Sequence, residues 1–146
     1  MTRVLVTGVA GFLGSHVAEA LLARGESVTG LDNFDTFYGR PVKEANVAGL
    51  VSNPRFTMVE GDIRDAALLR GLLASGDAVM HLAARAGVRP SLEDPALYAS
   101  VNVTGTATLL EAARAAGVRA FVFAGASSVY GDTAPVPFRE DFAALN

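Results

Sequence analysis

A glycine pattern near the start of the chain constrains its fold more than any other feature. Residues 7–14 read Thr-Gly-Val-Ala-Gly-Phe-Leu-Gly. A short apolar run precedes the pattern at residues 3–7, and apolar residues at helical spacing follow it from about residue 12 to residue 24. Between a strand and a helix, glycines allow a tight turn, close approach of a pyrophosphate and close packing of the helix on the sheet. The pattern predicts a phosphate-binding turn at the amino terminus of a helix, with a purely structural turn as the alternative.

The same alternation of β-branched apolar runs and helical segments continues along the chain. Further strands are expected at residues 27–32, 55–60, 77–81 and 120–124, and further helices at residues 41–51, 66–73 and 95–116. The apolar residues expected to form one buried face of the first helix are Leu13, Val17, Ala20 and Leu21.

These elements predict one α/β domain over residues 1–146. With right-handed crossovers, it is a Rossmann doubly wound parallel sheet of about five strands in the order 3-2-1-4-5, with helices on both faces. In such a sheet, ligands bind beyond the carboxyl ends of the strands where the order reverses. We therefore expect the binding chemistry just after Val6, Leu31 and His81.

Asp32 ends the second expected strand, where a carboxylate can accept hydrogen bonds from both hydroxyls of the adenosine ribose of a dinucleotide. The same charge repels a 2'-phosphate, and the following Asn33 and Phe34 offer no arginine to hold one. The pattern favours NAD over NADP. The alternative is a solvated acid at the end of a strand.

The composition excludes several classes of protein. The chain has 146 residues, a formal net charge of -3 and no cysteine, so a disulfide framework, a cysteine nucleophile and a thiolate metal site are ruled out. The mild acidity predicts no broad affinity for nucleic acid, and no apolar run is long enough to place the chain in a membrane. His16 and His81 are expected to be surface or packing residues without a third ligand for a metal. We expect a cytoplasmic protein.

Several motifs follow one another in an informative order. They are the glycine pattern, Asp32-Asn33-Phe34, Gly61-Asp62-Ile63, His81-Leu82-Ala83-Ala84 and Ser127-Ser128-Val129-Tyr130-Gly131. In this order the chain resembles the extended short-chain dehydrogenase/reductase superfamily. More closely, it resembles nucleotide-sugar epimerases of the UDP-glucuronate 4-epimerase type.

The resemblance implies that NAD+ removes hydride from C4 of a UDP-sugar, the 4-keto sugar rotates, and hydride returns to its other face. It also implies roles for single residues: Gly8, Gly11, Phe12 and Leu13 would hold the pyrophosphate, Asp32 and Asn33 the adenosine ribose, Asp62 and Ile63 the adenine, and Leu82, Ala83 and Ala84 the nicotinamide side, while Asn102 would brace the loop after the fourth strand. Each has a plainer alternative: Asp62 as a turn cap, Asn102 as an exposed helix residue, and residues 82–84 as ordinary core.

The acid–base pair of that family is missing from the chain. The family uses a tyrosine four residues before a lysine, because a nearby positive charge lowers the pKa of the phenol. The only lysine here is Lys43, with Gly39 four positions before it, so this chain does not supply the pair. In the family the pair usually follows the Val-Tyr-Gly motif by some twenty residues, so the resemblance implies a position just beyond Asn146. Ala126 stands where family members usually carry a serine or threonine that bonds the sugar. Ser127 and Ser128 are candidates for sugar contact or simple turn residues, and no catalytic residue is expected in this chain.

Three interpretations stay open. The first is an NAD-binding domain without its substrate domain, inactive alone. The second is an active epimerase or dehydratase completed by a longer parent or a second chain, and the third is a non-catalytic scaffold. Arg85 and Arg89 are candidates for contact with a sugar carboxylate or phosphate, or ordinary solvated side chains. A homo-oligomer is expected, formed through the edge of the fifth strand or through the helices at residues 66–73 and 95–116.

Overall fold

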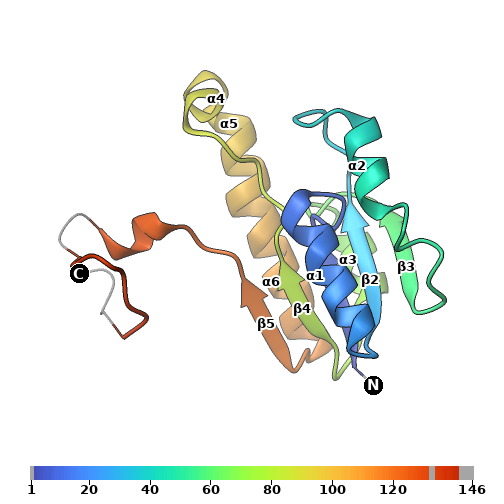
Figure 1. Cartoon of the computed structure of the whole chain (residues 1–146). Helices are drawn as coiled ribbons and strands as arrows, with labels where there is room; N and C mark the ends of the chain where they lie inside the picture. Colours follow the sequence, from blue (N-terminus) through green and yellow to red (C-terminus); the bar gives the residue numbers. More distant parts are fainter. Residues whose placement is uncertain (1, 132–133, 142–146) are drawn as a thin grey trace.

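The central feature of the molecule is a parallel sheet. The computed structural model describes residues 2–131 and 134–141. Its strands are β1 (Arg3–Thr7), β2 (Ser27–Asp32), β3 (Phe56–Glu60), β4 (Ala78–His81) and β5 (Ala120–Phe123). They lie in the order β3-β2-β1-β4-β5 with every neighbouring pair parallel, which confirms the predicted fold class and strand order (Figure 1).

Helices cover both faces of the sheet and divide the core into two clusters. On one face, α1 (Phe12–Ala23) and α2 (Arg40–Val47) pack against side chains that alternate along β1 and β2, among them Val6 and Val28. On the other face, α3 (Ala66–Leu72) and α6 (Thr106–Ala116) pack against Leu5 and Leu31. This alternation is that of strands buried on both sides.

The buried face of α1 differs from the prediction. Leu13 is exposed, as is Ala20, while Val17 and Leu21 are only partly buried. The buried residues are Gly14, Ser15, Ala18 and Leu22. The physical reason is the close approach of the helix to the sheet, because a Cβ atom at Gly14 would collide with the carbonyl oxygen of Gly8. Small residues therefore face the sheet, and the larger apolar residues lie beside this contact.

The long helix predicted at residues 95–116 consists of three consecutive helical segments. They are α5 (Pro95–Tyr98), a π-helical segment η1 (Ala99–Gly105) and α6, which ends at Ala116 and is capped by Gly117 with a φ of 70°, as expected for a glycine cap. Asp94 caps the start by accepting a hydrogen bond of 3.0 Å from the amide of Leu97. Widened turns of this kind are often found at functional sites.

Other boundaries move by a few residues. The helix predicted at residues 41–51 ends at Val47, and α4 (Val88–Glu93) and the 3-10 helix η2 (Ser127–Tyr130) have no counterpart in the prediction. Neither α4 nor η2 buries a residue, so neither has the apolar period that reveals a helix in a sequence.

The sheet ends at β5, which pairs only with β4 in the part of the chain that the structure describes. Val122 and Phe123 on this strand are exposed, and the chain beyond it leads away from the sheet (Figure 1). None of the helices within the described ranges is long and apolar enough to cross a bilayer.

Candidate functional site

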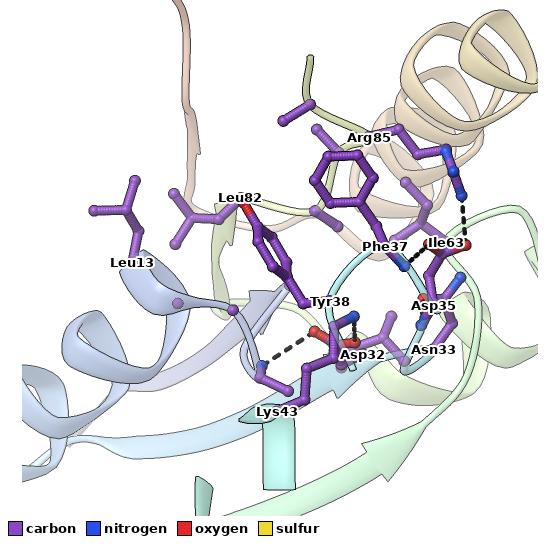
Figure 2. Close-up of a pocket in the computed structure, with 18 of the residues that line it drawn as sticks. Leu13, Asp32, Asn33, Asp35, Phe37, Tyr38, Lys43, Ile63, Leu82 and Arg85 are labelled. Carbon is purple, nitrogen blue, oxygen red and sulfur yellow. Dashed lines mark hydrogen bonds and ion pairs between the residues drawn. The ribbon is translucent and has the colours of Figure 1, made fainter. Parts of the chain in front are cut away.

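A pocket of about 550 Å³ lies beyond the carboxyl ends of the central strands, where the strand order predicted it. It is lined by the β1–α1 turn, the β2–α2 loop and the loops after β3 and β4 (Figure 2). Of the predicted cofactor residues, those that line it are Gly8, Gly11, Phe12, Leu13, Asp32, Asn33, Asp62, Ile63, Leu82, Ala83 and Ala84. Residues from four separate loops therefore meet in one site.

The glycine turn has the geometry of an anion site. Gly8 adopts a φ of +71°, and a Cβ atom there would lie 2.8 Å from the backbone nitrogen of Ala83, so only glycine fits. The helix that follows begins at Phe12, with Gly11 as an N-cap that offers no side chain, and has no acidic residue in its first turn. Its first amides and the positive end of its dipole are thus available to a phosphate in the pocket.

Asp32 lies in this pocket with a partner that the motif reasoning missed. Its Oδ1 accepts a hydrogen bond from Nζ of Lys43 at 2.9 Å (Figure 2). The same Oδ1 accepts from the amide of Phe34 at 2.8 Å, and Oδ2 accepts from the amide of Ala10 at 3.1 Å. Asp32 is 6% exposed and Lys43 is 8% exposed, so this is a buried ion pair. The only sequence signal for this contact was that Lys43 is the single lysine among many arginines, and that signal does not indicate which residue Lys43 would pair with.

The ion pair changes how a ribose would be held. A carboxylate has about four acceptor positions, and the three donors already on Asp32 leave about one for a ribose hydroxyl. The predicted acceptance of both ribose hydroxyls therefore exceeds what Asp32 offers while Lys43 is in place. Lys43 also lines the pocket and has further N–H donors for a hydroxyl oxygen, so the pair as a unit matches a diol.

Asp62 is held in the next loop by two side chains. Arg64 donates to both of its carboxylate oxygens, from Nε at 2.8 Å and from Nη2 at 2.7 Å, and Asn33 donates through Nδ2 at 3.0 Å. The hydrogen bonds from the Arg64 side chain are the main reason that the pKa of Asp62 falls to about 2. Asp62 also accepts from the amide of Arg64 at 2.9 Å, so it caps a turn while lining the pocket.

His81 supports the β4 end from beneath the pocket. It is 1% exposed, its Nδ1 lies 2.6 Å from Oγ1 of Thr7, and its Nε2 lies 2.9 Å from Oγ1 of Thr106. The Thr7 oxygen accepts from the amides of Leu82 and Ala83, both at 3.2 Å, so the Thr7 hydroxyl donates its proton to the ring. His81 is thus neutral with its proton on Nε2, and burial lowers its pKa. This geometry agrees with the predicted packing role.

Asn102 lies outside the pocket wall but braces its β4 loop. Its Oδ1 accepts from the amide of Arg85 at 2.8 Å, and its Nδ2 donates to the carbonyl of Arg85 at 3.0 Å. Tyr98 adds a hydrogen bond of 2.6 Å from its hydroxyl to the carbonyl of Ala86. The contact expected of Asn102 is therefore present, and the π-helical segment η1 carries the side chain that makes it.

Arg85, a candidate for contact with a sugar carboxylate or phosphate, lines the pocket, whereas Ser127, Ser128 and His16 do not. Ser127 and Ser128 are exposed in η2, beyond the end of β5, next to Ala126. His16 is exposed on α1, with Nδ1 2.8 Å from the carbonyl oxygen of Phe12. Across residues 2–131 and 134–141, the acidic and histidine side chains form no group suited to hold a metal ion.

Residues 4–146 match the NAD dependent epimerase/dehydratase family. The chain belongs to this family. It is 49% identical over 140 residues to UDP-glucuronate 4-epimerase 3 of Arabidopsis thaliana, covering 94% of this chain and 32% of that protein. It is 44% identical over 143 residues to UDP-glucuronate 4-epimerase of Thermodesulfobacterium geofontis (strain OPF15), covering 97% of this chain and 44% of that protein.

Comparison with solved structures gives similarity to proteins of the same kind. UDP-glucuronic acid 4-epimerase from Bacillus cereus, in complex with UDP-glucuronic acid and NAD, superposes with a TM-score of 0.84 at 36% identity over 99% of this chain and 46% of that chain. A dTDP-glucose 4,6-dehydratase from Streptomyces venezuelae with NAD bound gives 0.84 at 37% identity over 99% and 45%. The chain therefore spans between about a third and about a half of the length of these relatives.

Proposed function

We propose that the chain is the NAD-binding part of a nucleotide-sugar 4-epimerase of the UDP-glucuronate type. The observation that carries the proposal is the meeting, in one pocket, of the uncapped amino terminus of α1 with the buried carboxylate of Asp32. The first suits a pyrophosphate and the second suits a ribose. The NAD bound in similar structures supports the same assignment.

Each part of the pocket then has its own task. Gly8 and Gly11 shape the turn that admits the pyrophosphate, and the amides of Phe12 and Leu13 bind it, since the Gly8 and Gly11 amides already donate to the carbonyls of Leu31 and Gly8. Asp32, Asn33 and Lys43 bind the adenosine ribose, and Asp62 and Ile63 face the adenine. Leu82, Ala83 and Ala84 line the nicotinamide side, and Asn102 braces the last of these loops. The cofactor supplies an acceptor and donor of hydride when bound, and these residues orient it.

NAD is preferred over NADP in this proposal. Asp32 would repel a 2'-phosphate, and the charge of its partner Lys43 is already neutralised by it. The other cations at this side of the pocket, Arg64 and Arg85, are paired with Asp62 and Asp35. A second phosphate would therefore meet no unpaired positive charge among these groups.

Turnover needs a proton-transfer pair that these 146 residues do not contain, since the only lysine is the buried partner of Asp32. The chain by itself therefore binds cofactor without converting a sugar. In a complete enzyme, the remaining residues would add the UDP-sugar site and the tyrosine–lysine pair. We place this enzyme in the cytoplasm as a homo-oligomer.

Calorimetric titration with NAD, and with NADP as the matched ligand, tests the proposal. We expect NAD to bind and NADP to bind at least about tenfold more weakly, as expected for one uncompensated charge contact. A folded sample that binds neither ligand would favour a non-catalytic scaffold instead. Formation of UDP-galacturonate from UDP-glucuronate by the chain alone would show that it carries the full activity of an epimerase.

A further inference from the structure

One ion pair joins the two loops on either side of the pocket. Nη1 of Arg85, in the loop after β4, donates to Oδ2 of Asp35, in the β2–α2 loop, at 2.6 Å (Figure 2). The two residues are 50 positions apart in the sequence. The cofactor contacts assigned above do not use this pair, which spans the point where the strand order reverses.

Arg85 is the fixed partner of the pair. The side chain of Asn102 bonds both the backbone amide and the backbone carbonyl of Arg85, and the Arg85 side chain is only 19% exposed. The guanidinium carbon lies 5.5 Å from the ring centroid of Tyr98 and 5.9 Å from that of Phe37, within the range of cation–π attraction. Its Nε is buried without a hydrogen-bond partner among the described residues, so Asp35 and the two rings position the side chain.

Asp35 is the centre of the loop that Arg85 holds. Its Oδ1 accepts from the amide of Phe37 at 2.9 Å, and its own amide donates to Oδ1 of Asn33 at 3.0 Å. The rings of Phe37 and Tyr38 contact each other edge to face, 5.0 Å apart, and both line the pocket. Figure 2 shows them projecting from this loop, Phe37 toward Arg85 and Tyr38 toward Leu82. Whatever holds Asp35 therefore also places these rings.

We propose that Arg85 is a positioning residue for dinucleotide binding, which clasps residues 33–38 over the adenosine end of the pocket through Asp35. The clasped loop begins at Asn33, which bonds Asp62 at 3.0 Å, so it covers the side of the pocket assigned to adenine and ribose. This inference rests on the proposed function for its ligand. The contacts that form the clasp do not depend on that assignment.

Two effects of removing Arg85 must be separated. Loss of the clasp frees the loop, but it also leaves the Asp35 carboxylate uncompensated beside an anionic ligand, which weakens binding by repulsion alone. Arg85→Met keeps an unbranched stem against the two rings and removes the charge. The double variant Arg85→Met with Asp35→Asn restores the net charge without restoring the clasp. Arg85→Lys keeps the charge and a single donor, as the native contact needs.

The matched control is Arg24→Met. Arg24 is an exposed arginine at the end of α1, so this variant removes the same charge far from the pocket. Binding is measured as the affinity and the dissociation rate of NAD. We expect Arg85→Met to weaken affinity about tenfold, mainly through faster dissociation, as for loss of a hydrogen bond between charged groups. The double variant should stay weak, Arg85→Lys should recover most of the affinity, and the control should match the wild type.

Amide hydrogen exchange in the ligand-free protein tests the clasp without NAD. The Phe37 amide should exchange faster in Arg85→Met, while amides of β1 and β4 stay protected. Unchanged exchange at Phe37, unchanged affinity in Arg85→Met, or full recovery of affinity in the double variant would each overturn the proposal. If the wild type binds no NAD, the proposed function fails, and the exchange measurement still decides whether the clasp exists.

Discussion

At the scale of single residues, the buried pair of Asp32 and Lys43 is the most consequential contact. A carboxylate with 6% exposure would be strongly destabilised without a counter-charge, and Lys43 supplies it at 2.9 Å. Lys43 stands on α2, while Asp32 ends β2, so the pair also ties a helix to the rim of the pocket. Asn46, one turn later on α2, donates to the carbonyl of Ala10 at 2.9 Å and extends this link to the glycine turn.

Lys43→Met should lower the free energy of unfolding by about 3 kcal/mol, because it leaves a buried carboxylate unpaired. Urea denaturation followed by circular dichroism measures the change. The double variant with Asp32→Asn should recover part of the loss, since it removes the charge that was left unpaired. An unchanged urea midpoint in Lys43→Met would mean that the ion pair contributes no stability.

The other residue-scale prediction concerns His81. Burial lowers the pKa of the folded histidine below its ordinary 6.5, so below that pH the unfolded chain binds a proton that the folded chain does not. The contribution of neutral His81 to the free energy of unfolding is fully present above pH 6.5. It falls as the pH decreases from there, by at most about 1.4 kcal/mol per pH unit.

Glutamine can replace both hydrogen bonds of His81 without titrating, so His81→Gln should flatten this dependence between pH 6.5 and 5. Denaturation at several pH values measures it. His16→Gln is the matched control, because it replaces the exposed histidine and leaves His81 in place. Equal slopes in the wild type and His81→Gln would contradict the assignment.

At the scale of elements, the contact of α1 with the glycine turn determines how close the helix lies to the sheet. Helical period correctly predicts a helix over about residues 12–24, observed at Phe12–Ala23, but it predicts the wrong buried face, since Leu13 and Ala20 are exposed. The period of apolar residues describes the side chains of the helix alone. It contains no information about a backbone contact in which the smallest residue must face the sheet.

Two glycine-to-alanine substitutions separate the effect of this backbone contact from the effect of helix propensity alone. Gly14→Ala should destabilise the fold by about 2 kcal/mol or more and weaken NAD binding, because its Cβ would collide with the Gly8 carbonyl. Gly71 lies in α3 with no atom within 4 Å of an added Cβ, so Gly71→Ala should stabilise by about 0.5–1 kcal/mol. Thermal unfolding measures both, and a neutral Gly14→Ala would argue against the close packing.

At the scale of the whole molecule, the sheet has one conspicuous edge. β5 has β4 as its single partner in the described structure, and Phe123 on it is 60% exposed. An exposed strand edge with apolar side chains favours association with another chain. This exposed edge is the structural basis for expecting an oligomer. The helices α3 and α6, on one face of the sheet, offer a second surface.

We predict that light scattering will give a mass above that of one 15.1 kDa chain at micromolar concentration. Phe123→Lys should reduce this mass if the strand edge is the contact, because a charge at an edge opposes pairing. Leu110→Lys is the counterpart on α6, where Leu110 is exposed. A strictly monomeric mass for the wild type would contradict self-association through either surface.

By itself, the sequence determined the order of the strands, the parallel sheet and the place of the pocket, because these follow from local period, glycine turns and right-handed crossovers. Only the tertiary structure decided which side chains meet there. Lys43 reaches Asp32 across 11 positions and Arg85 reaches Asp35 across 50. Such contacts depend on how loops fold back over strand ends, and a pattern of residues along the chain does not encode those distances. The strands therefore determine where the site lies, and the packing of its loops determines which charged side chains pair in it.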